Sequence, residues 1–330
     1  MRIEIIIPDI DHYRYFFSDL VSNEHNVVLG KSFSLIKRLG VYTKQNKYLE
    51  KCFYEATLIL LKRHCNIKKA DVIAITDVAD KKLPKGFIRW LKLKYPQKKY
   101  VLLLYNKIST LYGLDGNVDM TELPERDYWL PFDKIYSYDI EESKRLGFEF
   151  FVAISDVSKL IQKKNNGITH DVFYCGSVGA EWKKGRYEEA DRIYNYLLNN
   201  NIDCDFHLVV NSKINIPDRP YLTKNRISYL EMERRTIKSR VILDIVSSNK
   251  NGISSRFYDA LIYNKKYLTN NKEIIKHPYY NPTYMKVYED LNDIDIEWIK
   301  QDEVVDYHYD NRYTPAGLYD LMVNTFGYNV

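Results

Sequence analysis

Two short segments of the sequence combine small residues with an arginine, in a pattern suited to binding a phosphate-like anion. The first runs from Gly176-Ser-Val-Gly179 to Lys184-Gly-Arg186, directly after the apolar run Val172-Phe-Tyr-Cys175. Small residues after a buried strand let the backbone approach a ligand, and the first turn of the next helix offers unpaired N–H groups. Arg186 would add a guanidinium fork that fits a phosphate. We therefore predict an anion site at this junction.

The same arrangement recurs after the apolar run Val241–Ile245. A polar loop containing Gly252 follows, and Ser254 or Ser255 is placed to cap the next helix. An anion at the start of that helix would gain from the helix dipole and from Arg256. The sequence therefore predicts two anion-binding turns in its second half.

Arg256 is followed three residues later by Asp259, so the two side chains would share one helical face. Asp259 would lie one turn into the helix, within reach of a ribose hydroxyl. The alternative is a local ion pair between the two residues, which would not exclude ligand binding.

Candidate proton acceptors follow the first strands that we predict. Asp9, Asp11 and His12 come after the apolar run Ile3–Ile7, and Asp77 follows a second such run. The carboxyl ends of parallel strands are the usual places for catalytic groups in such folds. We take these four residues as candidates for a general base.

Other kinds of site are disfavoured. The sequence has no GxGxxG after its first strand, no Walker A motif and no HExxH, and its four cysteines form no CxxC pair. Three Asp-x-Asp pairs are about what chance gives. We therefore expect neither a metal nor a bound cofactor. No apolar run is long enough to span a membrane, and the start of the chain reads as a buried strand rather than a secretory signal. The four cysteines lie on apolar segments, as expected for reduced core cysteines of a cytoplasmic protein.

Charge is concentrated in one part of the chain. Residues 31–107 carry 19 Lys and Arg side chains against 5 Asp and Glu, whereas the whole chain has a net charge of +5. The helical parts of this region also hold Phe87, Trp90 and Leu91. We predict either a solvated surface or a face that docks on anionic lipid, with these three side chains in the headgroup layer. No nucleic-acid-binding module accompanies the charge, so we expect no nucleic acid partner.

Alternating strands and helices must position these residues, which predicts an α/β protein with parallel sheets. The expected strands are Ile3–Ile7, Val72–Thr76, Tyr100–Tyr105, Lys134–Tyr138, Phe150–Ile154, Val172–Cys175, Phe206–Val210, Val241–Ile245 and Lys266–Thr269. The expected helices are Tyr48–Arg63, Phe87–Lys94, Glu141–Leu146, Tyr187–Leu198, Leu230–Lys238, Arg256–Ile262 and Pro315–Phe326. We predict two doubly wound, Rossmann-like domains, residues 1–165 and residues 166–313, that face each other across a cleft. A C-terminal helix in residues 314–330 is expected to return to the first domain.

One stretch of the second half resembles a known family. The pattern consists of Ser239, Ile242-Leu-Asp-Ile245, Gly252, Ser254, Arg256, Asp259, Leu261 and Lys265-Lys-Tyr-Leu-Thr-Asn270. It is similar to the signature of GT-B glycosyltransferases from bacterial capsular polysaccharide and lipopolysaccharide clusters. Phe132–Gly147 and Asp171–Gly176 also resemble segments of that group. The chain departs from the pattern at Asp259, where the group has Glu, and at Asn264, where many members have Gly.

The resemblance implies a metal-independent transferase of the hexosyl or N-acetylhexosaminyl class. Such an enzyme moves a sugar from a nucleotide-diphosphate sugar, here a UDP-sugar, to a glycan or glycolipid acceptor on the inner face of the plasma membrane. The first domain would bind the acceptor and the second the donor. The expected donor-binding residues are Gly176, Ser177, Arg186, Ile227, Ser228, Asn249, Gly252, Ile253, Ser254, Ser255, Arg256 and Asp259. A nucleotide-sugar epimerase and a non-catalytic sugar-nucleotide-binding scaffold are the alternatives.

Overall fold

The structure is a computed structural model, and it describes most of the 330 residues. Side chains are described throughout these ranges except those of 11, 12, 26–29, 47 and 184. The described ranges are 1–8, 10–18, 26–29, 47–62, 67–81, 83–84, 86–106, 131–158, 160–161, 167–178, 184–210, 217–246 and 252–327. The chain forms two compact units. Unit 1 comprises Met1–Ser155 and Arg312–Val330, and unit 2 comprises Asp156–Asn311, where we expected boundaries at 165/166 and 313/314.

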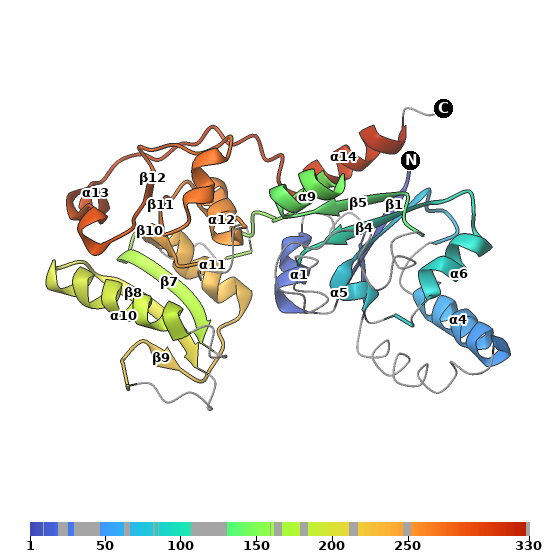
Figure 1. The fold of residues 1–330 in the computed structure, drawn as a ribbon, viewed down its shortest axis with the longest axis horizontal. Helices are drawn as coiled ribbons and strands as arrows, with labels where there is room; N and C mark the ends of the chain where they lie inside the picture. Colours follow the sequence, from blue (N-terminus) through green and yellow to red (C-terminus); the bar gives the residue numbers. More distant parts are fainter. Residues whose placement is uncertain are drawn as a thin grey trace. The chain divides into compact units, whose positions relative to one another are not determined.

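Unit 1 contains a six-stranded parallel sheet in the order β2-β1-β3-β4-β5-β6 (Figure 1). The strands are β1 (Ile3–Pro8), β2 (Asn26–Leu29), β3 (Val72–Thr76), β4 (Lys99–Leu104), β5 (Lys134–Ser137) and β6 (Glu149–Phe150). The helices are α1 (Asp11–Phe16), α4 (Lys47–Lys62), α5 (Asp77–Asp80), α6 (Phe87–Lys94), α9 (Ile140–Leu146) and α14 (Pro315–Gly327). The expected strand Phe150–Ile154 is wrong beyond its first residue, because the backbone leaves the sheet after Phe150.

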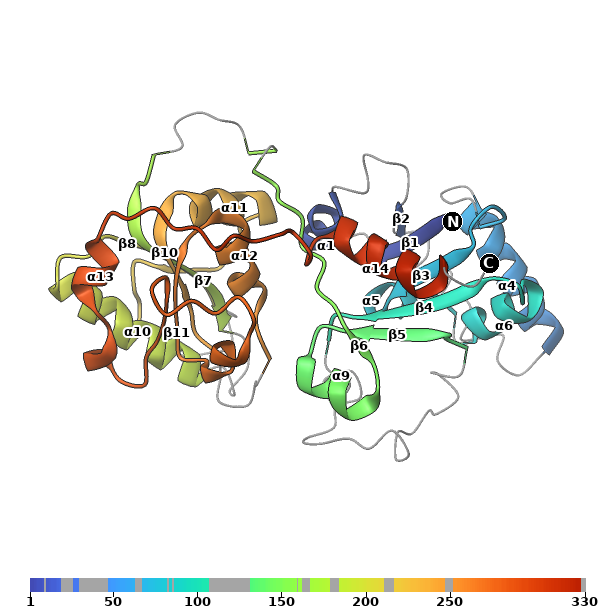
Figure 2. The same cartoon turned by 90° about the horizontal axis from the view of Figure 1, so that it is seen from above.

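Apolar side chains cover both faces of this sheet. Successive residues of β1 point to opposite faces, so Ile5 enters one core and Ile6 the other. One core is closed by α4 and α6, which lie side by side at one end of the unit (Figures 1 and 2). The other includes Leu318 and Met322 of α14, so the C-terminal helix packs on the first unit as the sequence predicted.

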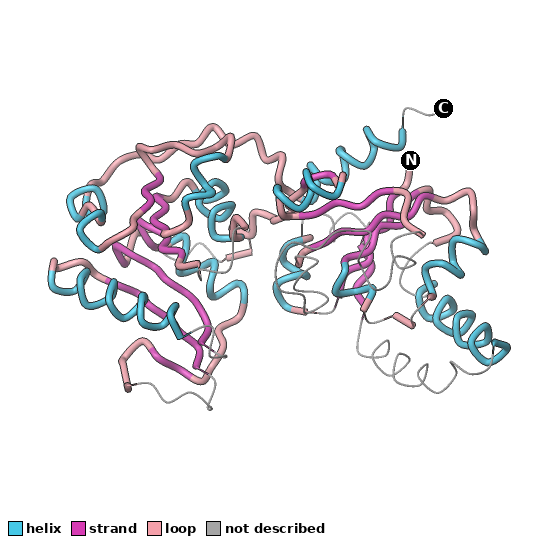
Figure 3. Tube along the Cα trace, in the orientation of Figure 1, coloured by secondary structure: helices cyan, strands magenta, loops and turns pink. Residues whose placement is uncertain are grey.

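Unit 2 repeats the architecture with the order β12-β11-β10-β7-β8-β9, again parallel (Figure 3). Its strands are β7 (His170–Val178), β8 (Cys204–Val210), β9 (Leu222–Thr223), β10 (Ser239–Asp244), β11 (Lys266–Thr269) and β12 (Met285–Val287). Its helices are α10 (Lys184–Asn199), α11 (Tyr229–Ile237), α12 (Ser255–Tyr263), α13 (Ile296–Lys300) and the 3₁₀ turns η3 (Lys272–Lys276) and η4 (Leu291–Asp293). Figure 2 shows α11 and α12 on one face of the sheet and α10 on the other.

Local sequence fixes several helix ends. The Asp139 carboxylate accepts the Glu142 amide at 2.8 Å and so caps α9. At the end of α12, Asn264 adopts a left-handed conformation with φ of 50°. Asparagine tolerates this region better than most residues, which explains how Asn264 replaces the glycine that we expected from the family pattern.

Candidate functional site

The candidate site lies at the carboxyl edge of the sheet in unit 2, between β7 and β10. The chain runs outward through β8 and β9 on one side and through β11 and β12 on the other, so the strand order reverses between β7 and β10. Ligands of open α/β sheets bind at such reversal points, outside the carboxyl ends of the strands. The register pairs Ile242 with Phe173, and β7 continues through Val178, beyond the end of β10. Gly176 and Ser177 therefore lie inside β7, and our prediction of a turn at these two residues is wrong.

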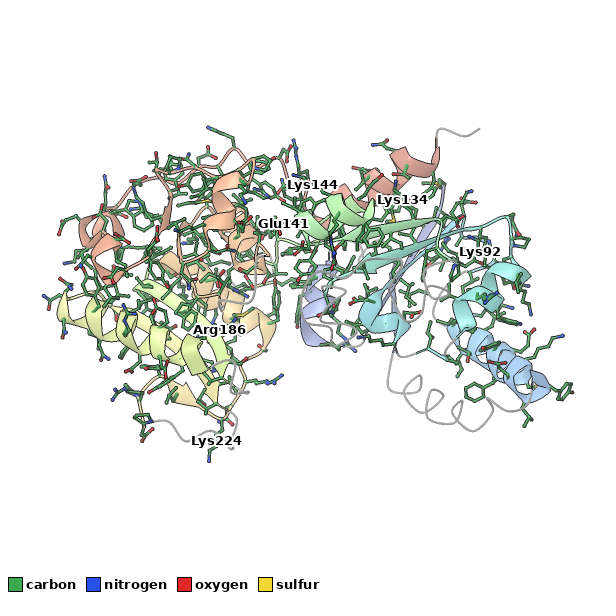
Figure 4. All side chains as sticks on the ribbon, in the orientation of Figure 1. Lys92, Lys134, Glu141, Lys144, Arg186 and Lys224 are labelled. Atoms are coloured by element: carbon green, nitrogen blue, oxygen red, sulfur yellow. The ribbon has the colours of Figure 1, made fainter. Side chains whose placement is uncertain are left out.

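Three buried hydrogen-bond donors lie beneath α10, where Tyr174 is close enough to interact electrostatically with Arg186 and with Tyr288. Figure 4 labels Arg186 there. Among the described residues, the Arg186 Nε and the hydroxyls of Tyr174 and Tyr288 have no hydrogen-bond partner. The Tyr174 hydroxyl lies against Gly176, since a Cβ atom at Gly176 would be 2.8 Å from it. Burial raises the pKa of Tyr174, and the nearby Arg186 guanidinium partly opposes this rise.

Three buried donors without acceptors are costly unless an acceptor arrives. A phosphate group supplies several acceptor oxygens and a charge opposite to that of Arg186. Sequence analysis singled out Arg186 and missed both tyrosines. The position of Tyr174, two residues before Gly176 and hence on the same face of β7, was the available signal.

The start of α12 forms the second half of the site. Ser254 is the N-cap residue, and its hydroxyl accepts the Arg256 amide at 3.2 Å. The same hydroxyl donates to the Asp244 carboxylate at 2.7 Å. Ser255 is the first helical residue, and Gly252 and Ile253 lead into the turn. Asn249 lies outside the described residues.

The Arg256 guanidinium is turned toward α11. It lies 2.9 Å from the Asp259 carboxylate and 3.5 Å from that of Glu233, and only 11% of the side chain is exposed. Burial alone would lower the pKa of Arg256, but the carboxylates of Asp259 and Glu233 raise it above its ordinary value. The local Arg256–Asp259 ion pair that we considered is therefore present, and Glu233 is a third member that sequence analysis did not identify.

The two carboxylates of this network differ from ordinary surface acids. Burial and the neighbouring Asp259 charge raise the pKa of Glu233 to about 8, against the opposing effect of Arg256. Asp259 is only 1% exposed. A contact between Asp259 and a ribose hydroxyl stays a prediction.

The remaining second-half candidates lie before α11. Ser228 caps this helix by accepting the Glu231 amide at 3.2 Å, and Ile227 precedes it half-buried. Their contact with the donor was inferred from the family resemblance alone and stays a prediction.

In unit 1, Asp77 follows β3 at the reversal of strand order between β1 and β3. Asp77 is buried at the start of α5 and accepts hydrogen bonds from the Tyr105 amide at 3.3 Å and the Asn106 side chain at 2.8 Å. Burial raises its pKa, and these bonds oppose the rise. Asp77 therefore anchors the end of β4. Asp9 lies outside the described residues, as do the side chains of Asp11 and His12, although both belong to α1.

Within the described ranges, no three His, Cys, Asp or Glu side chains come together as a metal site would need. No helix in these ranges is both long enough and apolar enough to cross a bilayer.

Comparison with known proteins places the chain by its fold. No family model matches it, and no curated protein matches it in sequence. A solved alpha-glucosyltransferase, in complex with UDP and a 13-mer DNA containing a mismatch, is similar over 97% of this chain and 92% of its own, with 14% identity and a TM-score of 0.51. A UDP-N-acetylglucosamine 2-epimerase from Rickettsia bellii is similar over 99% of this chain and 96% of its own, with 12% identity and a TM-score of 0.46. A glycosyltransferase from Rickettsia africae gives 11% identity, 91% and 87% coverage and a TM-score of 0.44.

The fold is therefore established, and it is the one predicted. Two parallel sheets with helices, each reversing its strand order once, give the two-domain GT-B architecture of the alpha-glucosyltransferase.

Proposed function

We propose that this protein is a glycosyltransferase that uses a nucleotide-diphosphate sugar, with UDP as the nucleotide, and adds a hexosyl or N-acetylhexosaminyl group to a glycan or glycolipid of the cell surface. The observation that carries the proposal is the set of buried, unpartnered hydrogen-bond donors on Arg186, Tyr174 and Tyr288 beneath α10. The start of α12, which follows the neighbouring strand β10, completes the site. The similarity to an alpha-glucosyltransferase in complex with UDP supports the choice of nucleotide.

In the proposed reaction, unit 2 holds the diphosphate and stabilises it as it leaves. Charge develops on the leaving diphosphate when its bond to the sugar breaks, and donors already fixed in place stabilise that charge without reorganisation. The two tyrosine hydroxyls and Arg186 would donate from below α10, and the amides around Ser254 and Ser255 from the first turn of α12. The other expected donor contacts, including Asn249, Ile227 and Ser228, complete this proposal.

The base that takes the proton of the acceptor hydroxyl would come from the carboxyl edge of the first sheet. Of the four candidates, Asp77 is committed to Tyr105 and Asn106, so Asp9, Asp11 and His12 are the better choices. Wild-type turnover in all three single alanine variants would reject them as a group.

The acceptor is proposed to be lipid-linked, with unit 1 docking on the anionic inner face of the plasma membrane as a peripheral protein. Our prediction that Phe87, Trp90 and Leu91 lie in the headgroup layer is wrong. Phe87 and Leu91 are core residues, and Trp90 packs on Tyr54 and Phe87. The exposed apolar side chains of α4 and α6 are different ones. They are Tyr48, Leu49 and Ile59 on α4 and Leu93 on α6.

Lysines accompany these exposed side chains. Tyr48 is 74% exposed and shares a stripe of α4 with Lys51, Ile59 and Lys62, since the four are spaced by helical turns. Apolar tips among basic groups are typical of surfaces that bind anionic headgroups.

The test is incubation of the protein with labelled UDP-hexoses or UDP-N-acetylhexosamines, with bacterial membranes as acceptor. Transfer of label to lipid or glycan supports the proposal. Isomerised nucleotide sugar without transfer would favour an epimerase, nucleotide-sugar binding without turnover would favour a scaffold, and label on added duplex DNA would contradict the proposed acceptor.

The same assay with excess chelator tests metal independence. Activity that survives EDTA agrees with stabilisation by protein donors alone. Complete loss that added Mg²⁺ or Mn²⁺ restores would overturn this part of the mechanism.

A further inference from the structure

The stretch that resembles GT-B glycosyltransferases also contains polar residues to which we have assigned no contact with the donor. Asp244 and Asn270 are polar side chains at the carboxyl ends of the central strands β10 and β11, and Asn271 follows directly. All three are engaged with the two ends of the segment that joins β10 to α12. That segment leads into the turn proposed to receive the donor.

Asn270 holds the beginning of the segment. Its side-chain oxygen accepts the Val246 amide at 2.9 Å, and its side-chain nitrogen donates to the Val246 carbonyl at 3.1 Å. This pair of bonds copies the way one backbone residue pairs with another across a sheet. It fixes Val246 two residues beyond the last residue of β10.

Asn271 and Asp244 hold the end of the segment. The Asn271 side chain donates to the Gly252 carbonyl at 3.1 Å, while its oxygen accepts the Glu273 amide at 3.1 Å and starts η3. The Asp244 carboxylate accepts the Ser254 hydroxyl and the Tyr267 hydroxyl, each at 2.7 Å. Because Ser254 gives its proton to Asp244, its lone pairs are directed to the amides of α12.

We infer that Asp244, Asn270 and Asn271 are positioning residues that hold the first turn of α12 in the geometry that binds the donor phosphates. They act through Val246, Gly252 and Ser254 and need not touch the donor. The inference rests on the proposed function for the identity of the ligand, and on the hydrogen bonds alone for the positioning itself.

Preorganised groups bind a ligand more tightly because the cost of ordering them has already been met in folding. Releasing the start of α12 should therefore weaken binding of the phosphates without removing any group that contacts them. In Asn270→Ala and Asn271→Ala we expect the Kd for UDP to rise about tenfold. A change of this size corresponds to the net contribution of roughly one hydrogen bond. Asn270→Asp retains the acceptor for the Val246 amide and should recover part of the affinity.

Ser239→Ala provides the matched control. Ser239 is fully buried at the amino end of β10 and donates to the Thr236 carbonyl at 2.9 Å, so its loss costs a comparable buried hydrogen bond away from α12. The first measurement is calorimetric titration with UDP, together with KM and kcat for the UDP-sugar. The inference is supported if Kd and KM rise in both asparagine variants while their kcat stays close to the wild-type value. Ser239→Ala should be close to wild type in all three constants.

The second measurement is hydrogen–deuterium exchange of the amides of residues 252–258 without ligand. These amides should exchange faster in the asparagine variants than in wild type or in Ser239→Ala. Unchanged exchange and unchanged Kd would overturn the inference while leaving the proposed function intact. If the wild-type protein binds no UDP, the proposed function fails, and exchange alone decides whether the positioning is real.

Discussion

The two sheets are both parallel and each reverses its strand order once, but they bury different chemistry. In unit 1, apolar cores lie on both faces, and the few buried charges are satisfied: Lys98 donates to the Lys68 and Ala70 carbonyls, and Asp77 binds the end of β4. In unit 2, one apolar core lies beneath α10 and α13. The face beneath α11 and α12 includes the buried Glu233–Arg256–Asp259 network.

The contrast underlies the proposal that unit 2 holds the donor. Apolar burial stabilises a sheet but recognises nothing in particular. Buried donors without acceptors lower stability, so they persist where a ligand completes them. In the described part of the chain, the Arg186, Tyr174 and Tyr288 donors stand in unit 2. The following experiments test this difference between the units.

The largest expected effect is on the stability of unit 2. Arg256→Ala would leave the buried Asp259 carboxylate without its counter-charge and the buried Glu233 without its partner, which costs about 3–5 kcal/mol. We expect this loss in the free energy of unfolding, measured by urea denaturation. The sequence assigned Arg256 to the donor anion, and its contacts with Glu233 and Asp259 add this structural role. Arg234→Ala, which breaks an exposed pair with Glu231 on α11, should cost less than about 1 kcal/mol. Equal losses in the two variants would contradict a special role for the buried network.

The next effect is on donor affinity. Arg186→Ala removes a charge-assisted contact worth about 1.5–3 kcal/mol, so the Kd for UDP should rise roughly ten- to a hundredfold with little change in melting temperature. Tyr174→Phe, which deletes only the unpartnered hydroxyl, should weaken binding while leaving stability unchanged or slightly higher. Arg192→Ala, six residues further along α10, is the control. Unfolding of Arg186→Ala with normal activity per folded molecule would make Arg186 structural.

A smaller effect concerns pH. Because burial raises the pKa of Glu233 from 4.5 to about 8, the folded protein holds a proton that the unfolded chain has released, and stability falls as pH rises through this window. The lowered pKa of His277, about 4, gives the opposite slope, but only below pH 6.5. Between pH 6.5 and 8 the loss should be at most about 1.4 kcal/mol per pH unit. In thermal unfolding, Glu233→Gln should not lose stability as pH rises across this range. If its stability falls with pH as steeply as that of the wild type, Glu233 is not the source of the loss.

The smallest expected effect is on membrane binding by unit 1, through the exposed side chains of α4 and α6. Each lysine near an anionic leaflet contributes about 1 kcal/mol, so Lys51→Glu with Lys62→Glu should reduce cosedimentation with anionic liposomes at low salt. The double variant Tyr48→Ser with Leu93→Ser should do the same. Lys224→Glu in unit 2 is the control. Wild-type binding no stronger to anionic than to neutral vesicles would leave the basic region as solvated surface.

Local sequence patterns predicted the architecture and the positions of Arg186 and Ser254 at the starts of α10 and α12. Apolar runs of strand length separated by helical patterns predicted two parallel sheets, because each run must be buried on both faces. Cap residues such as Asp139 and Ser254 act through their immediate neighbours, so their roles were also readable from local sequence. Arg186 was found because it follows its strand within a short segment.

The contacts of those residues depend on the tertiary structure. Glu233 belongs to a different helix from Arg256, and Tyr288 lies more than a hundred residues from Tyr174, so no local spacing links them. The amphipathic pattern of α6 identified an apolar face, but packing against α4 decided that Phe87 and Leu91 face the core and Leu93 faces outward. Likewise, Asn270 reads as an ordinary loop residue until β10 and β11 are placed side by side. Side-chain chemistry is local, whereas burial and partnership are set by elements that meet only in the folded chain.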